Sequence, residues 1–148
     1  MKKIVFICHG NICRSPMAEY IMKDLVRKAG RSGEFRISSA AVSSEELGNP
    51  IYPPARRKLD EKGIPHGEHR AHKISLAEYD DNDAVIVMDE SNRRRLAGIT
   101  GGPDDGKVRL LMEYTGTRRD VADPWYTGDF ETTYRDILAG CSALLESL

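Results

Sequence analysis

A buried strand that leads through a glycine-containing loop into a helix is the feature that most constrains this fold. Apolar residues 4–7 precede residues 8–16, which include a glycine, an arginine and a proline. Proline suits the first turn of a helix and serine is a favourable N-cap, so we expect Ser15 to cap a helix that begins at Pro16. The loop amides and the positive end of the helix then point into one cavity. This arrangement predicts an anion-binding site.

A thiol lies at the base of the predicted cavity. Cys8 follows the strand directly, and neighbouring positive charge favours its thiolate, which is the nucleophilic form of cysteine. Arg14 is six positions further along the chain, far enough for the loop to curl and bring the guanidinium back over the same anion. Its parallel N–H groups suit two phosphoryl oxygens better than a lysine would. The sequence therefore predicts a nucleophile and a clamp for a phosphate-like group.

Strand and helix patterns alternate along the chain and favour the α/β class. The predicted strands are residues 3–8, 34–42, 83–88 and 108–112. One predicted helix starts after residue 15, a second ends near residue 63, a third holds residues 93–96 and a fourth starts near residue 130. A turn is expected at 101–106. We expect one domain, residues 1–148, with a four-stranded parallel sheet, helices on both faces and the phosphate-binding loop after the first strand. Ligands of such sheets bind beyond the carboxyl ends of the strands, at a switch in strand order, where Cys8 is expected to lie.

The charge balance and the cysteine count exclude several classes. The 22 Lys and Arg residues nearly cancel the 23 Asp and Glu residues, which gives no reason to expect a nucleic acid or a membrane as a partner. The apolar run near residue 4 is too short for a signal peptide or a membrane span. Three cysteines, an odd number, do not make a disulfide framework. We therefore expect a cytoplasmic protein with reduced thiols.

Three segments give the chain a resemblance to a known family. Residues 8–19 (CHGNICRSPMAE) resemble the signature of the low-molecular-weight protein tyrosine phosphatases, residues 123–126 (DPWY) resemble the element that carries the general acid of that family, and residues 88–92 (MDESN) resemble the segment after its third strand. The three occur in the order of the family and span essentially the whole chain. The resemblance implies hydrolysis of phosphotyrosine in proteins and of aryl phosphates without a cofactor. The partner it implies is a phosphotyrosine-containing protein, with a tyrosine kinase as one candidate substrate.

The expected mechanism assigns a role to each candidate residue. Cys8 attacks phosphorus to give a cysteinyl-phosphate, Arg14 clamps the transition state, and Asp123 acts as general acid and then as general base. Trp125 and Tyr126 are expected to form an apolar wall beside an aromatic substrate. The predicted phosphate-binding loop consists of His9, Gly10, Asn11, Ile12, Cys13 and Arg14.

A second set of residues is expected to support the loop. Ser15 could donate its hydroxyl to the Cys8 sulfur in addition to capping the helix. Asn11 tolerates a left-handed backbone, and its side chain could brace the loop from beneath. By resemblance a histidine supports that brace, and its spacing from the third strand indicates His69. Asp89 has two open roles, tuning the charge of the site or capping the next helix.

Several residues near the site have alternative interpretations. Cys13 is either a resolving cysteine for an oxidised Cys8 or a small packing residue. Glu45 and Glu46 are expected near the mouth of the cavity, where they would repel acidic flanks of a phosphopeptide, and Tyr52 could replace an aromatic residue that well-studied relatives carry in that loop. The histidines at 66, 69 and 72 are not expected to hold a metal, because Arg70 and Lys73 would repel a cation and no further ligands complete a set.

Other functions remain open from the sequence. A protein-arginine phosphatase of the same fold typically has threonine before the second loop cysteine, where this chain has the apolar Ile12. An arsenate reductase needs further cysteines near the third strand, and residues 83–100 contain none. A noncatalytic phosphate-binding module or phospho-carrier would not need Asp123. These comparisons favour phosphotyrosine hydrolysis.

Overall fold

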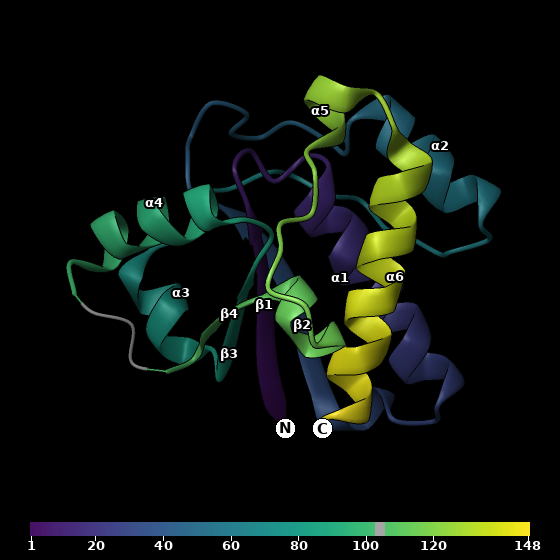
Figure 1. Cartoon of the computed structure of the whole chain (residues 1–148), viewed down its shortest axis with the longest axis horizontal. Helices are drawn as coiled ribbons and strands as arrows, with labels where there is room; N and C mark the ends of the chain where they lie inside the picture. The colour runs from purple at the N-terminus through teal and green to yellow at the C-terminus, as the bar shows by residue number, and fades with distance from the viewer. Residues whose placement is uncertain (103–105) are drawn as a thin grey trace.

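Four parallel strands form one sheet in the order β2-β1-β3-β4 (Figure 1). The computed structural model describes residues 1–102 and 106–148, so the central part of the turn expected at 101–106 lies outside the described residues. The strands are β1 (Lys2–Cys8), β2 (Phe35–Ala41), β3 (Ala84–Val87) and β4 (Val108–Leu110). The predicted four-stranded parallel sheet is confirmed.

Helices cover both faces of the sheet, as expected for a parallel sheet. One face carries α1 (Arg14–Lys28), α2 (Pro53–Glu61) and α6 (Phe130–Glu146), and the other carries α3 (Leu76–Asp81) and α4 (Glu90–Thr100) (Figure 1). Alternate residues of β1 enter different cores: Ile4 and Phe6 pack in the core beneath α1 and α6, whereas Val5 and Ile7 pack with Leu96 of α4. Each face is thereby closed by its own apolar layer.

The order of the strands places Cys8 at a switch point. From β1 the chain continues to β2 on one side, and it later returns to β3 on the other side of β1. Cys8 is the last residue of β1, at the carboxyl end of the sheet. Loops that leave the sheet on opposite sides diverge there and leave room for a ligand.

The first helix begins earlier than predicted. It starts at Arg14, its N-cap is Cys13 with no side-chain hydrogen bond, and Pro16 is its third residue. The prediction that Ser15 caps this helix is therefore wrong. The reason is tertiary, because the Ser15 hydroxyl is occupied by contacts with Asn11 and Cys8 in the loop.

Besides the 3₁₀ helix η1 (Ser32–Glu34), three short helical elements were not predicted. The helix α3 has six residues, and Tyr79 is its buried residue, so its apolar pattern is too short to recognise in the sequence. Ser75 caps this helix by accepting the Glu78 N–H. The strand expected at 108–112 ends at Leu110 and continues as the 3₁₀ helix η2 (Leu111–Thr115). The third is α5 (Pro124–Thr127), which carries two of the predicted site residues. None of the helices in the described residues has the length and apolar character needed to cross a membrane.

Candidate active site

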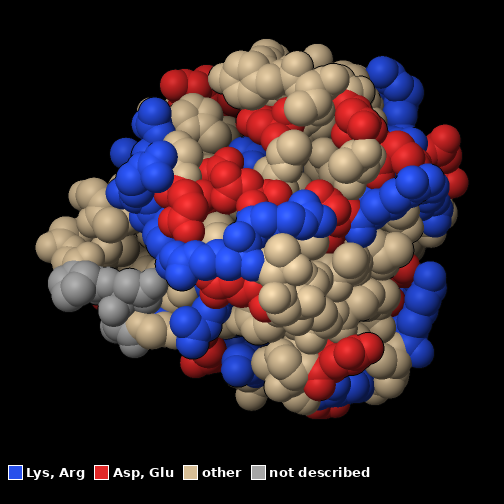
Figure 2. Space-filling view, in the orientation of Figure 1, with Lys and Arg blue, Asp and Glu red and all other residues tan. Residues whose placement is uncertain are grey.

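A cavity of about 130 Å³ opens at the carboxyl end of the sheet, directly above Cys8. The loop of residues 9–14 after β1 (the catalytic loop of the mechanism proposed below), the segment after β2 and the segment around α5 contribute its walls. At the end of the molecule where α5 lies, Figure 2 shows uncharged surface flanked by acidic side chains. The lining residues are Cys8, His9, Gly10, Ile12, Cys13, Arg14, Glu45, Glu46, Asp123, Trp125 and Tyr126.

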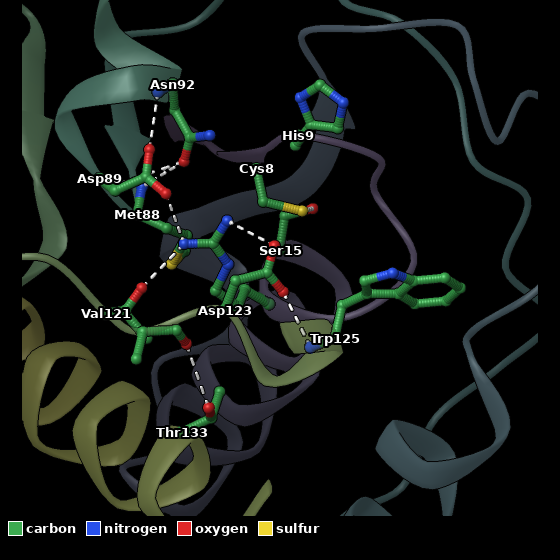
Figure 3. Close-up of polar contacts among 12 residues, drawn as sticks. Cys8, His9, Ser15, Met88, Asp89, Asn92, Val121, Asp123, Trp125 and Thr133 are labelled. Carbon is green, nitrogen blue, oxygen red and sulfur yellow. Dashed lines mark hydrogen bonds and ion pairs between the residues drawn. The ribbon is translucent and has the colours of Figure 1, made fainter. Parts of the chain in front are cut away.

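The Cys8 sulfur lies at the floor of this cavity beside Ser15 (Figure 3). The Asn11 N–H donates to Sγ at 3.3 Å, and Ser15 Oγ lies 3.0 Å from Sγ. Because the Asn11 side-chain amide donates to Ser15 Oγ at 2.8 Å, the Ser15 hydroxyl hydrogen is free to point at the sulfur. Two donors therefore stabilise negative charge on this sulfur.

Asn11 holds the loop from beneath in a left-handed backbone conformation, with φ of 60°. Its side-chain amide donates to Ser15 and, at 3.0 Å, to Ser39 Oγ, and its Oδ1 accepts the His72 N–H at 3.3 Å. His69 Nε2 lies 2.6 Å from the Asn11 carbonyl oxygen and therefore carries a hydrogen. The structure thus brings His69 and Ser15 to the loop, as the sequence led us to expect.

Ser39 is a supporting residue that the sequence analysis missed. It lies on β2 and is buried, and its hydroxyl donates to Glu19 Oε1 at 2.6 Å. Lys23 pairs with the second oxygen of Glu19. Two adjacent serines in a strand of the buried sheet were the available signal, because a buried hydroxyl needs a partner.

Arg14 is buried and faces inward. Its Nη1 donates to Asp89 Oδ2 at 2.7 Å and to the Val121 carbonyl oxygen at 2.8 Å, and its Nη2 lies 3.4 Å from Asp123 Oδ2. Burial by itself lowers the pKa of Arg14, but the negative charges of Cys8, Asp123 and Asp89 outweigh burial and raise this pKa above its ordinary value. The guanidinium is therefore fixed as a cation beside the sulfur.

Asp89 fills both of the roles left open by the sequence. Its Oδ1 accepts the Asn92 N–H at 2.7 Å and so caps α4, while its Oδ2 binds Arg14 (Figure 3). Asn92 completes the cap by accepting the backbone N–H groups of Met88 and Asp89. The cap of a helix on one face of the sheet thereby orients the arginine of the loop.

Asp123 lies across the cavity from Cys8 at the start of α5. Its Oδ1 accepts the Trp125 N–H at 3.0 Å, which holds the carboxylate in place. Trp125 and Tyr126 remain 51% and 84% exposed at the mouth. Tyr52 packs against the Trp125 ring, with ring centroids 4.8 Å apart, and so supports the aromatic wall from behind.

Cys13 lies in a small apolar cluster with Ile12 and Ala71. Burial raises the pKa of the Cys13 thiol, and the negative charges of Cys8 and Asp123 raise it further. Cys13 therefore stays in its protonated, neutral form.

The three histidines considered as metal ligands make separate contacts. His66 pairs with Asp60 at 2.8 Å, His72 pairs with Glu78 at 2.9 Å, and His69 binds the Asn11 carbonyl. Across the described residues, 1–102 and 106–148, no group of three or more metal-ligating side chains comes together. In α4, Arg94 and Arg95 are exposed, whereas Arg93 is half-buried and donates to the Val108 carbonyl.

The fold and the cavity together define a class: a parallel α/β protein in which a cysteine, an arginine and an aspartate face one phosphate-sized cavity. Comparisons with known proteins are more specific. The family described as low molecular weight phosphotyrosine protein phosphatase matches residues 3–148. The chain belongs to this family, whose members are phosphoric monoester hydrolases.

Individual relatives cover nearly the whole chain. The low molecular weight protein-tyrosine-phosphatase YfkJ of Bacillus subtilis is 37% identical, covering 100% of this chain and 96% of the relative. Its crystal structure superposes with a TM-score of 0.95 over 99% of this chain and 94% of that one. The low molecular weight phosphotyrosine protein phosphatase of Rattus norvegicus is 37% identical over 98% of this chain and 94% of its own. The crystal structure of DARP, the Drosophila arginine phosphatase, is 30% identical with a TM-score of 0.89, covering 99% of this chain and 97% of its own.

Proposed function

We propose that this protein hydrolyses phosphotyrosine in proteins, and aryl phosphates in general, through a cysteinyl-phosphate intermediate. The observation that carries the proposal is the convergence of Cys8, Arg14 and Asp123 on one cavity. The membership of the chain in the phosphotyrosine phosphatase family supports the same reaction. A phosphotyrosine-containing protein is then the partner, with a tyrosine kinase as one candidate, in the cytoplasm.

In the first step the Cys8 thiolate attacks phosphorus as the bond from phosphorus to the phenolic oxygen breaks. Asp123 gives its proton to the departing phenolate, since it lies across the cavity with its carboxylate held by Trp125. In the second step the Asp123 carboxylate takes a proton from water, the water oxygen attacks phosphorus and the sulfur–phosphorus bond breaks. The thiolate leaves toward the donors that it already has, the Ser15 hydroxyl and the Asn11 N–H.

The phosphoryl oxygens are bound by the loop and by Arg14. In this scheme the backbone amides of the loop from His9 to Arg14 donate to the phosphoryl oxygens, and the buried guanidinium supplies a fixed positive charge. Gly10 and Ile12 line the same space. Because these groups are held before substrate arrives, little reorganisation is needed as charge develops in the transition state. The scheme needs no cofactor and no metal.

A second candidate substrate is phosphoarginine, on the ground that the Drosophila arginine phosphatase has a similar structure. The cavity argues for phosphotyrosine as the better substrate. Ile12 lines it with an apolar side chain, and Trp125 and Tyr126 supply aromatic surface for a phenyl ring. A guanidine would find no polar side chain at position 12.

The test compares matched phosphotyrosine and phosphoarginine peptides and an aryl phosphate that carries no charge apart from its phosphate. We expect the wild-type enzyme to prefer phosphotyrosine and Cys8→Ser to lose turnover by about 10⁴-fold or more, because the covalent step is removed. Cys141→Ala is the matched control, since Cys141 is buried against α1 far from the cavity. Turnover by Cys8→Ser at the wild-type rate would refute the covalent mechanism, and a faster reaction with phosphoarginine would refute the substrate assignment.

A further inference from the structure

The two walls at the mouth of the cavity differ in chemistry. One wall is aromatic and consists of Trp125 and Tyr126 on α5. The other wall comes from the segment after β2 and is acidic, because it carries Glu45 and Glu46. The phosphate-binding floor is positive because of Arg14 and the loop amides. A phosphorylated peptide therefore meets two electrostatic environments, a positive floor and a negative rim.

The acidic wall is fastened to the catalytic loop at His9. Ser43 donates to the His9 carbonyl oxygen through its N–H at 3.2 Å and through its hydroxyl at 2.9 Å. Two residues after Ser43, Glu45 Oε2 lies 2.9 Å from His9 Nε2. The residue that follows the nucleophile thus holds this segment by its backbone and by its side chain.

Glu46 is also fixed in place. A Cβ atom on Gly10 would lie 3.1 Å from Glu46 Cγ, so the glycine lets the glutamate pack closely over the loop. Asn49 donates to Glu46 Oε2 at 2.6 Å and orients the carboxylate. Both glutamates are therefore held at the rim by contacts with neighbouring loops.

The rim carboxylates retain capacity for a positively charged partner. The Glu45 side chain is 68% exposed, and His9 occupies one of its oxygens. The Arg14 charge is already opposed by Asp89 and Asp123, so it does not neutralise the rim. A carboxylate accepts several hydrogen bonds at once, which leaves room for a lysine or arginine of a substrate.

We propose that Glu45 and Glu46 form a subsite for a basic residue next to phosphotyrosine in the substrate, and that His9 is the positioning residue that holds Glu45 toward it. The inference rests on the proposed phosphatase activity. The phosphate binds at the floor, the phenyl ring lies against the aromatic wall, and the neighbouring side chain of the peptide reaches the acidic wall. An acidic neighbour is repelled by the same two carboxylates.

The test uses three phosphotyrosine peptides that differ only in the residues flanking phosphotyrosine, which are lysine, alanine or glutamate. Exposed ion pairs are each worth about twofold to fivefold in affinity. We therefore expect kcat/KM of the wild-type enzyme to be about tenfold higher for the lysine peptide than for the glutamate peptide at low salt, with the alanine peptide between them. Because the glutamates are exposed to solvent, 0.5 M salt should reduce this ratio toward one.

Charge-removing variants assign the preference to its residues. Glu45→Gln and Glu46→Gln should each lower the lysine-to-glutamate ratio by about twofold to fivefold, and the double variant should bring it close to one. Glu34→Gln is the matched control, because Glu34 precedes β2 at the opposite end of the sheet and pairs with Arg31. This control should keep the wild-type ratio.

His9 is tested through its coupling to Glu45. His9→Ala should lower the ratio in the wild-type background and leave it unchanged in the Glu45→Gln background, whereas His9→Gln, which can still donate a hydrogen bond, should retain part of the preference. Equal effects of His9→Ala in both backgrounds would contradict the positioning role. A general loss of structure would change kcat for all peptides alike and leave the ratio in place.

The control substrate separates the two proposals. A simple aryl phosphate has no flanking charge, so its hydrolysis reports the chemistry alone. Absence of turnover with it would overturn the proposed function. Turnover combined with a lysine-to-glutamate ratio near one, or with a ratio that persists in the double variant, would overturn the acidic subsite and leave the phosphatase reaction in place.

Discussion

The catalytic loop and the segment that carries Asp123 face each other across one cavity, but they are built differently. In the loop, Asn11, Arg14 and Ser15 are at most 2% exposed, and each side chain has partners in the protein. In the opposite segment, Trp125 is 51% exposed and Tyr126 84% exposed. The phosphate-binding half is therefore organised by folding, whereas the half that meets the rest of the substrate remains open to solvent.

This difference follows from what each half must bind. A phosphoryl group has one shape and charge, so fixed donors are most effective in stabilising its transition state. Such donors must be anchored, since a buried polar group without a partner costs about 1–3 kcal/mol. The leaving group and the peptide vary between substrates, and exposed side chains can contact them at little cost to the fold. Substitutions on the two sides should consequently separate catalysis and stability from binding.

Among the substitutions that compare the two halves, the largest effect is expected from Asp123→Asn. The amide keeps the size and the contact with the Trp125 N–H but cannot transfer a proton, so hydrolysis of phosphotyrosine should fall by about 10²–10⁴-fold. Para-nitrophenyl phosphate should lose less, because its leaving group needs less protonation. Steady-state kinetics with both substrates measure this, with Asp136→Asn on α6, which pairs with Arg119, as the control. An equal loss for both substrates would argue against the role as general acid.

Substitution of Asn11 tests the anchored half. Asn11→Gly keeps the left-handed backbone but removes the hydrogen bonds of the Asn11 side chain with Ser15, Ser39 and the His72 N–H, so we expect a loss of about 1–3 kcal/mol in the free energy of unfolding. Asn11→Ala should lose about 1–2 kcal/mol more, because alanine disfavours the φ of 60°. Urea unfolding measures both variants. Equal stability of the two would show that backbone strain contributes nothing at this position.

Substitution of Trp125 tests the exposed half. Trp125→Ala removes an aromatic contact worth about 0.5–1.5 kcal/mol, so KM for phosphotyrosine peptides should rise by about twofold to tenfold. The urea midpoint should change little, since half of the side chain is in solvent. Tyr126→Ala provides a neighbouring comparison. A loss of stability as large as that of Asn11→Gly would remove the contrast between the two halves.

The smallest effect is expected on the pH dependence of stability and concerns His72, whose backbone N–H donates to Asn11 Oδ1. The hydrogen bond to Glu78 raises the pKa of His72 and outweighs the opposing effect of burial; the charges of Glu78 and Glu19 add to it. The charged pair therefore stabilises the fold fully below the unfolded pKa of about 6.5, and this stabilisation is lost as the pH rises through the higher folded value. Urea midpoints of wild type and Glu78→Gln, measured from pH 5 to 8.5, should converge at high pH. A constant difference would contradict this linkage.

Much of this architecture could be predicted from local patterns. The apolar runs gave β1 and β3 to within one or two residues, because strands buried on both faces are apolar throughout. The start of α1 was misplaced, since Ser15 resembles a helix cap in sequence but binds Asn11 and Cys8 in the structure. The helix α3 was missed because its apolar pattern is too short. Local propensity fails where a side chain has a stronger distant partner.

The sequence by itself predicted β1, the loop that follows it and the parallel α/β class, because each strand and helix pattern depends on residues that are close along the chain. Only the tertiary structure decided that Asp89 and the Val121 carbonyl orient Arg14, that Ser39 and His72 hold Asn11, and that His9 pairs with Glu45. These contacts join residues from 28 to 107 positions apart. Hydrogen bonds act over about 3 Å in space and leave no periodic trace in the chain, so folding alone brings their partners together.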